Sequence, residues 1–178
     1  MAQTATIYNL TIDLSNVDRG VYETIELRIA RQPSETAEYM LIRVLAYCLE
    51  YQEGITLTEG VASGNEPAIL VRDMTGRVTA WIEVGLPDPA RLHRGSKLAE
   101  RAAVYTSRLR LLMRQFEGSK IHKAEHVPIY AIDSDFIDEV AKRIDRRSAI
   151  GLSISEMQIY LTVAGQDFTS AIAEHRIS

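Results

Sequence analysis

Three glutamates are the residues of this sequence whose type and spacing could support catalysis. Glu83 lies within Val78–Val84, a run that is otherwise mostly apolar, and a buried carboxylate requires a partner. Glu66 comes just before a second apolar run, Ala68–Arg72. Carboxylate oxygens are the ligands that Mg²⁺ prefers, and bound Mg²⁺ can activate water for attack on a phosphoryl centre. The sequence therefore predicts a Mg²⁺ site at Glu66 and Glu83.

The two apolar runs predict an antiparallel hairpin that would bring these glutamates together. If Thr75-Gly76 is the tight turn, Glu83 faces Ala68 and Glu66 faces Gly85. Residues two apart share a face of a strand, so the glutamates become diagonal neighbours with α-carbons about 7–8 Å apart. A bulge between the strands would break this inference.

The third glutamate, Glu35, could complete the acidic cluster from a helix. Pro33-Ser34 predicts a helix start with Ser34 as the N-cap, which places Glu35 in the first helical turn. The alternative role of Glu35 is to favour the positive end of the helix dipole.

The other two glutamates also have structural alternatives. Glu66, which precedes Pro67, is equally well explained as an exposed loop residue. Glu83 can be a structural carboxylate that pairs with an arginine such as Arg43 or Arg101. The sequence leaves these alternatives open.

The surrounding sequence predicts the elements that would hold these residues. Strands are expected at Ala5–Leu14, Val21–Ile29, Ala68–Arg72, Val78–Val84, Ala102–Thr106, Val127–Ile132, Met157–Val163 and Phe168–Ala173. Helices are expected after Pro33-Ser34, after Asp88-Pro89, over Ser107–Phe116 and over Asp135–Arg147. This order predicts an α/β fold, with a single mixed β-sheet flanked by helices and a hairpin at each end.

Composition predicts a cytoplasmic protein of one domain. The chain has 178 residues, of which 46% are hydrophobic and 25% charged, so we expect a single domain over residues 1–178. No apolar run is long enough to span a membrane, and no signal peptide is visible. The single cysteine, Cys48, cannot form an internal disulfide. We expect a monomer as the default state.

Charge is distributed unevenly along the chain. Residues 89–124 contain nine Lys and Arg against two acids, Glu100 and Glu117, so this segment carries +7 although the whole chain carries −4. Such asymmetry indicates an anionic partner, and nucleic acid is the first candidate. The alternative is a solvated helical surface whose arginines pair with acids elsewhere in the chain.

Five motifs are Arg31–Thr36, Glu66-Pro67, Trp81–Pro87, Arg91–His93 and Ala103–Thr106. In these motifs the chain resembles the bacterial YaeQ family, and the similarity extends over nearly the whole sequence. The resemblance implies a variant of the restriction-endonuclease-like PD-(D/E)XK fold. It implies no established activity.

That fold ordinarily carries a helix glutamate, a strand acid, and an acid-X-lysine on the next strand. By this resemblance Glu35, Glu66 and Glu83 fall on matching positions, but Gly85 stands where the catalytic lysine would be. Some members of the fold take this lysine from a neighbouring element. Lys97 on the following helix is the candidate, with Arg94 and His93 as substitutes; the alternative is that Lys97 is an ordinary surface residue.

Two hypotheses follow from these observations. In the first, the protein is a Mg²⁺-dependent nuclease or phosphodiesterase, with metal at Glu66 and Glu83, help from Glu35 and Lys97, and nucleic acid guided by residues 89–124. In the second, it is a catalytically inactive module on the same scaffold that binds nucleic acid or a protein partner. The sequence does not decide whether the protein is an enzyme.

Overall fold

The structure, a computed structural model, describes residues 4–59 and 64–177. Its contacts divide the chain into two compact units, each built from two separate stretches of sequence. The first unit is Met1–Leu41 with Ile132–Ile172, and the second is Ile42–Ala131 with Ala173–Ser178. None of the described helices has the length and apolar character needed to cross a membrane.

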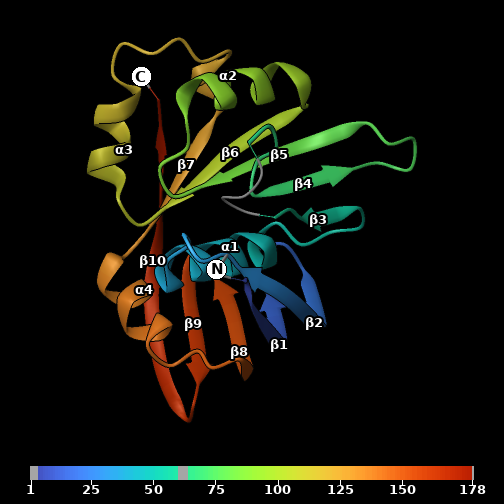
Figure 1. Cartoon of the computed structure of the whole chain (residues 1–178), viewed down its shortest axis with the longest axis vertical. Helices are drawn as coiled ribbons and strands as arrows, with labels where there is room; N and C mark the ends of the chain where they lie inside the picture. Colours follow the sequence, from blue (N-terminus) through green and yellow to red (C-terminus); the bar gives the residue numbers. More distant parts are fainter. Residues whose placement is uncertain (1–3, 60–63, 178) are drawn as a thin grey trace. The chain divides into compact units, whose positions relative to one another are not determined.

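Strands and helices in both units confirm an α/β protein (Figure 1). The first unit contains β1 (Thr6–Asn16), β2 (Val21–Arg31), α4 (Ser134–Ala141), β8 (Arg147–Ser155), β9 (Gln158–Val163) and most of β10 (Gln166–Arg176). The second unit contains β3 (Ile55–Leu57), β4 (Ile69–Arg72), β5 (Val78–Val84), α2 (Pro89–Leu98), β6 (Arg101–Thr106), α3 (Leu109–Phe116), the 3₁₀ helix η2 (Ala124–His126) and β7 (Pro128–Ile132). Helix α1 (Ala37–Leu49) carries the chain from the first unit into the second.

The sheet of the first unit has the strand order β2-β1-β8-β9-β10. Strand β1 pairs antiparallel with β2 and parallel with β8, and its apolar side chains Leu10, Ile12 and Leu14 are buried while the residues between them are more exposed. The predicted N-terminal and C-terminal hairpins are both confirmed. The second one turns on Ala164 and Gly165, whose φ values of 51° and 73° suit a two-residue hairpin turn.

The helix predicted over Asp135–Arg147 is too long. Helix α4 begins after Asp133, whose carboxylate accepts from the Phe136 amide at 3.2 Å, and it ends at Ala141. The Arg143 side chain then donates to the carbonyl of Glu139 at 2.7 Å, which satisfies one of the last helical carbonyls. The chain is therefore free to enter β8, a strand that the sequence interpretation did not assign.

The first helix starts later than predicted. Its N-cap is Thr36, whose hydroxyl accepts from the Tyr39 amide at 3.1 Å, rather than Ser34. Glu35 consequently lies before α1 and not in its first turn. The helix buries its apolar face, which consists of Met40, Leu41, Val44, Leu45, Cys48 and Leu49.

The sheet of the second unit has the strand order β7-β6-β5-β4-β3. Strands β5, β6 and β7 are parallel neighbours, whereas β4 pairs antiparallel with β5. The predicted hairpin register holds where the strands are regular, because Ile69 faces Ile82. A bulge between Val71 and Arg72 interrupts it near the turn, so the predicted tight turn at Thr75-Gly76 is replaced by a wider one that Asp73 closes.

Trp81 on β5 is central to the core of the second unit. Its side chain is buried with Leu92 of α2, Leu112 of α3 and Ile129 of β7. Gly95 of α2 lies directly against the indole ring, since a Cβ at this position would come within 2.4 Å of the ring atoms Cδ2 and Nε1. This close approach holds α2 against β5, which is the arrangement that positions the candidate site.

Candidate functional site

Glu83 is completely buried in the middle of the second unit's sheet. It sits on β5, where it pairs in register with Val104 of β6, and its relative exposure is 0%. The neighbouring Ile82 and Val84 are buried too. Moving a carboxylate from water into such surroundings costs several kcal/mol unless a cation and hydrogen bonds compensate.

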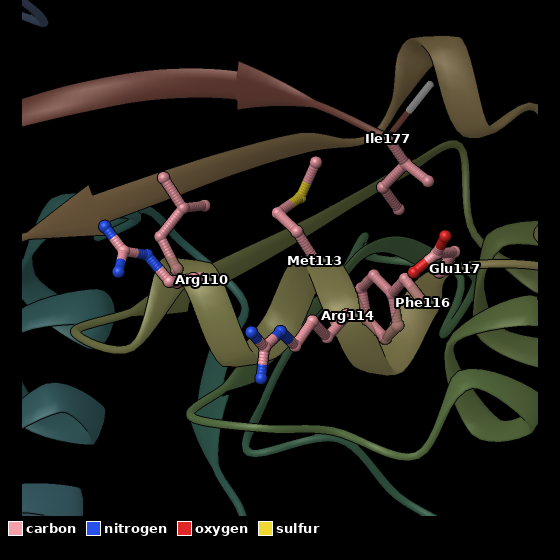
Figure 2. A pocket seen from close by; sticks show the side chains of 7 residues that line it. Arg110, Met113, Arg114, Phe116, Glu117 and Ile177 are labelled. Atoms are coloured by element: carbon pink, nitrogen blue, oxygen red, sulfur yellow. The ribbon is translucent and has the colours of Figure 1, made fainter.

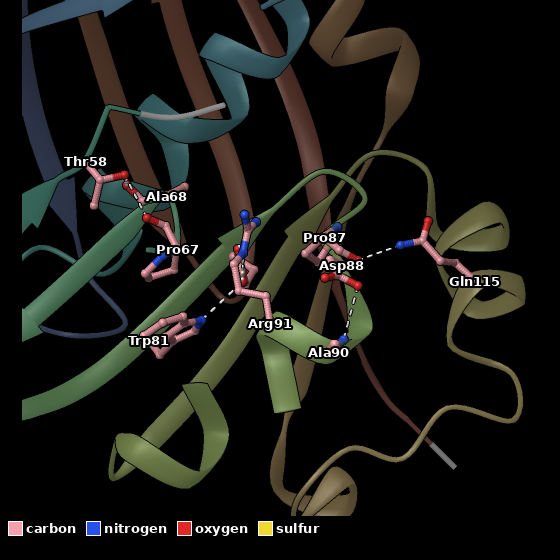
Figure 3. A network of polar contacts seen from close by, with 10 residues as sticks. Thr58, Pro67, Ala68, Trp81, Pro87, Asp88, Ala90, Arg91 and Gln115 are labelled. Atoms are coloured by element: carbon pink, nitrogen blue, oxygen red, sulfur yellow. Dashed lines mark hydrogen bonds and ion pairs between the residues drawn. The ribbon is translucent and has the colours of Figure 1, made fainter. Parts of the chain in front are cut away.

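Arg91 supplies that cation. Its Nε donates to Glu83 Oε2 at 2.8 Å and its Nη2 donates to Glu83 Oε1 at 2.7 Å. Trp81 adds a third hydrogen bond, from Nε1 to Oε2 at 3.2 Å. Figure 3 shows Arg91 beside Trp81 at the sheet. This is a two-point guanidinium–carboxylate pair, the strong geometry for such an interaction.

The start of α2 determines where Arg91 lies. Asp88 caps the helix by accepting from the Ala90 amide at 3.2 Å, and Pro89 occupies the first helical turn. Gln115 of α3 holds the preceding loop by donating to the Pro87 carbonyl at 2.6 Å (Figure 3). The Arg91 side chain therefore extends from the start of a helix whose N-cap and preceding loop are both held by hydrogen bonds.

Gly85 has a backbone reason to be glycine. Its φ is 75°, in the left-handed region, and its amide donates to the Tyr105 carbonyl at 2.8 Å. A lysine at this position would carry the strain that any side chain brings to that conformation. The position where the PD-(D/E)XK fold would carry its lysine is thus, in this chain, a turn after β5 whose backbone conformation favours glycine.

The remaining predicted site residues lie in different surroundings. Glu66 is exposed in a bend before β4, and Lys97 is exposed in the last turn of α2. Glu35 belongs to the first unit and is buried, and its carboxylate accepts from the Gln32 amide at 3.2 Å. Of the four residues proposed from sequence, Glu83 is the one buried in the second unit.

His93, the suggested substitute for the lysine, acts as a hydrogen-bond acceptor. Its Nδ1 accepts from the His122 amide at 3.0 Å. Burial, together with the charges of Lys97 and Lys120, lowers the pKa of His93 below its usual value. An imidazole whose Nδ1 accepts a hydrogen bond carries no proton on that atom, so in this arrangement His93 does not provide a cation.

The residues as arranged do not fit a Mg²⁺ ion. Both oxygens of Glu83 are occupied by Arg91, and a metal there would have to displace a guanidinium. Among the residues that the structure describes, no three His, Cys, Asp or Glu side chains are grouped to hold a metal. The Mg²⁺ site stays a prediction that requires Arg91 to move away.

Sequence reasoning missed a second buried acid in the same unit. Glu50 is held by Arg101, whose Nη1 donates to Glu50 Oε1 and whose Nη2 donates to Oε2 at 3.2 Å. The Tyr105 hydroxyl also donates to Oε2, at 2.6 Å. The Tyr105 ring packs against Tyr130 with centroids 4.8 Å apart.

The second acid alters the ionisation of its partners. Burial and the charge of Glu50 raise the pKa of Tyr105 well above its usual value. Burial would lower the pKa of Arg101, but Glu50 raises it above the ordinary range. Arg101, one of the partners considered for Glu83, is thus committed to a different carboxylate.

The nine cations of residues 89–124 fall into two groups. Arg91 and Arg101 are partly buried and neutralise Glu83 and Glu50. The other seven are exposed: Arg94, Lys97, Arg108, Arg110, Arg114, Lys120 and Lys123. Within residues 4–59 and 64–177, no carboxylate forms an ion pair with any of these seven, which we call the exposed cations. The alternative that arginines of this segment pair with acids elsewhere is therefore confirmed for Arg91 and Arg101, but not for these seven within the described residues.

A groove of about 550 Å³ runs beside α3 in the second unit. Met113, Phe116 and Ile177 form apolar parts of its lining, and the charged groups are those of Arg110, Arg114 and the acid Glu117 (Figure 2). The two arginines are one helical turn apart, so their guanidinium groups can contact neighbouring parts of one extended ligand.

Comparison with known proteins identifies the family. The fold and the site define an α/β protein that has a buried glutamate–arginine pair in a mixed sheet. The sequence pattern described as YaeQ protein matches residues 1–172, so the chain belongs to the YaeQ family. The predicted family resemblance is confirmed.

Relatives of similar length come from several bacteria. The chain is 30% identical over 164 residues to "Uncharacterized protein YaeQ" of Escherichia coli K12, covering 91% of each, and 30% identical to the Salmonella typhi protein of that name, covering 92% of each. It matches the crystal structure of the YaeQ protein from Pseudomonas syringae with a TM-score of 0.84 and 32% identity, covering 99% of this chain and 98% of that one. A YaeQ structure from Xanthomonas axonopodis pv. citri, at 22% identity, shares the fold with a TM-score of 0.82 over 98% of this chain and 100% of that one.

Proposed function

We propose that this protein binds nucleic acid through the exposed cations of residues 89–124, and that the Glu83–Arg91 pair supports the fold rather than catalysis. The carrying observation is the division of the nine cations. Two satisfy buried glutamates, and seven remain at the surface without an acidic partner among the described residues. Phosphates would neutralise these charges and release counterions, which is the main source of affinity for nucleic acid.

Helix α3 is the first place to expect phosphate contacts. Arg110 and Arg114 lie one turn apart along the groove, and Arg108 comes just before the helix. Arginine presents a planar fork of donors that matches phosphate oxygens, so a row of arginines favours a backbone that carries regularly spaced phosphates. The apolar part of the groove would lie beside the sugars or bases of the same strand.

Fluorescence anisotropy with labelled single-stranded and double-stranded DNA and RNA tests this proposal. We expect binding whose logarithm falls linearly with the logarithm of salt concentration. The double variant Arg110→Glu/Arg114→Glu should weaken binding at least about tenfold and reduce the salt slope by roughly one unit for each lost phosphate contact.

The matched control is Arg146→Glu/Arg147→Glu, which makes the same change in net charge at two exposed arginines of the first unit. Equal weakening by the two double variants would show that only net charge matters. A salt slope near zero, or no binding at low salt, would rule out phosphate contacts altogether.

A Mg²⁺-dependent nuclease on a restriction-endonuclease-like scaffold is the second candidate function. The observed register favours it, since continuing the pairing of Ile69 with Ile82 places Ala68 opposite Glu83, as the sequence hypothesis requires. Cleavage would need Arg91 to release Glu83 so that metal could bind with Glu66.

Incubation of the substrates above with Mg²⁺ or Mn²⁺ tests this second function. Cleavage that is abolished in Glu83→Gln, a variant that keeps the size of the side chain, would support it. Absence of cleavage, or equal cleavage by Glu83→Gln, would count against a nuclease site at Glu83.

A further inference from the structure

We propose that two copies of this chain associate through strand β2, which would join their first-unit sheets into one continuous sheet about a twofold axis at Leu27. β2 is the end strand of the order β2-β1-β8-β9-β10, and β1 is its one strand neighbour among the described residues. This inference does not depend on nucleic-acid binding, and it replaces the monomer expected by default.

Strand β2 lacks the features that usually protect an edge strand. It runs for 11 residues, Val21–Arg31, and contains neither proline nor lysine. Its register with β1 is uninterrupted from the pair of Thr6 with Arg31 to the pair of Asn16 with Val21, so no bulge twists the strand away. Proteins normally shorten, bulge or charge such edges because their unpaired backbone groups can bind another strand.

The charges that β2 does carry are arranged symmetrically. Glu26 and Arg28 are exposed on one face, on either side of Leu27, whose own side chain is buried on the other face. Two copies that pair antiparallel about Leu27 bring Glu26 opposite the partner's Arg28, and Arg28 opposite the partner's Glu26. Directly opposed charges of unlike sign stabilise a strand pair.

No neighbouring register gives this match. In a continuous sheet, directly paired side chains lie on the same face. The twofold axis must therefore pass through a residue, and the neighbouring registers place it at Glu26 or at Arg28. An axis at Glu26 would place Glu26 opposite the partner's Glu26, and an axis at Arg28 would place Arg28 opposite the partner's Arg28. Both put like charges in contact, so the charge pattern selects the axis at Leu27.

The buried face of the strand agrees with the same axis. Ile25 would face the partner's Ile29, and Leu27 would meet the partner's Leu27, so apolar side chains extend the sheet's core face across the junction. Charges placed only to protect an edge would carry one sign and repel a second copy. The alternating signs on β2 do the opposite.

The expected dimer is weak. The pairing rests on Ile25–Ile29, because Arg31 is already held by its hydrogen bonds to the Glu35 carbonyl and to Tyr8. Five paired residues extend about 17 Å, and such a contact buries less area than the roughly 1,200 Å² of a standard stable interface. Association should therefore appear only as protein concentration rises.

Sedimentation velocity over a concentration series tests the proposal. We expect a reversible monomer–dimer equilibrium in the wild type. Glu26→Arg and Arg28→Glu should each weaken dimerisation at least about tenfold, because each converts two favourable pairs into repulsive ones. The exchanged variant Glu26→Arg/Arg28→Glu should recover the wild-type constant, and an equimolar mixture of the two single variants should form a heterodimer.

Arg147→Glu is the matched control, since Arg147 and Arg28 both pair in register with Asn9, from opposite sides of β1. It should leave the dimerisation constant unchanged. Circular dichroism would confirm that each variant is folded. A wild type that stays monomeric at the highest concentration, or single variants that dimerise as the wild type does, would overturn the proposal.

Discussion

The buried pair of Glu83 and Arg91 accounts for a charge in the middle of the second unit's sheet. Each Glu83 oxygen accepts a short hydrogen bond from the same guanidinium, and Trp81 adds one more. Such a pair gains little net stability when it is formed, but it is costly to break, because either partner alone is an uncompensated charge in the core.

Removing the cation should therefore be far more damaging than its partial exposure suggests. We expect Arg91→Met to lower the free energy of unfolding by about 3–5 kcal/mol. The control Arg94→Met makes the same substitution at an exposed position of the same helix and should cost about 0.5 kcal/mol or less. Urea unfolding followed by the fluorescence of Trp81, the single tryptophan, measures both. Similar losses in the two variants would contradict a structural role for the pair.

Sequence alone predicted that Glu83 needs a partner, but not which one. The candidates named from sequence were Arg43 and Arg101, whereas the partner in the structure is Arg91. The pairing depends on how the chain leaves β5 through Gly85 and enters α2 at Asp88. Such long-range geometry has no local signal beyond the Asp-Pro cap.

Among the elements, β5 and α2 form a tightly packed pair. Gly95 allows the helix to approach the Trp81 ring, and Asp88 fixes where the helix begins. Helix α2 has few buried side chains of its own, so this one contact has a large share in holding it.

Gly95→Ala is expected to destabilise the protein even though alanine is the better helix former by about 1 kcal/mol. The added Cβ would lie 2.3 Å from the nearest Trp81 ring atom, so α2 or the ring must shift. We expect a lower unfolding midpoint and altered Trp81 emission. In the control Ser96→Ala, next along α2 and without this clash, the gain in helix propensity is offset by loss of the hydrogen bond to the His93 carbonyl, so the midpoint should change little and Trp81 emission should not change. An increase in stability with Gly95→Ala would show that α2 can move without cost.

The elements themselves were largely predictable where one pattern dominated. The alternating strands of both hairpins and the Asp88-Pro89 helix start gave clear signals. Strand β8 was missed although Ile150, Leu152 and Ile154 alternate as a strand should. The helical spacing of Phe136 and Val140 extends to Ile144, which led the predicted helix past its real end.

At the scale of the whole chain, the interleaving of the two units explains why no linker is visible in the sequence. The chain enters the second unit within α1, leaves it at the end of β7 and enters it again within β10, so each boundary lies inside a regular element. Boundaries of this kind carry no stretch of Pro, Gly or Ser, which sequence inspection needs to recognise a division.

The course of β10 through both units gives a paired prediction. Ile172 belongs to the first unit and Ile177 to the second, and both are buried. Each change to alanine should cost about 2–5 kcal/mol, but in different places. By hydrogen exchange, Ile177→Ala should chiefly reduce protection of β5 and β6 amides, because Ile177 packs in the Trp81 core. Ile172→Ala should chiefly affect β8 and β9. Identical exchange patterns would mean that the two units do not open separately.

Strand β1 acquires its two neighbours at very different moments of synthesis. β2 emerges from the ribosome directly after it, but β8 begins only at Arg147, once nearly all of the second unit has been translated. At about 5–20 residues per second, that delay is on the order of ten seconds. During this delay, Leu10, Ile12 and Leu14 lie in a two-stranded hairpin that has no third strand to pair with. We expect the apolar face of that hairpin to be exposed during translation, so ribosome-bound chaperones are where its earliest interactions should be sought.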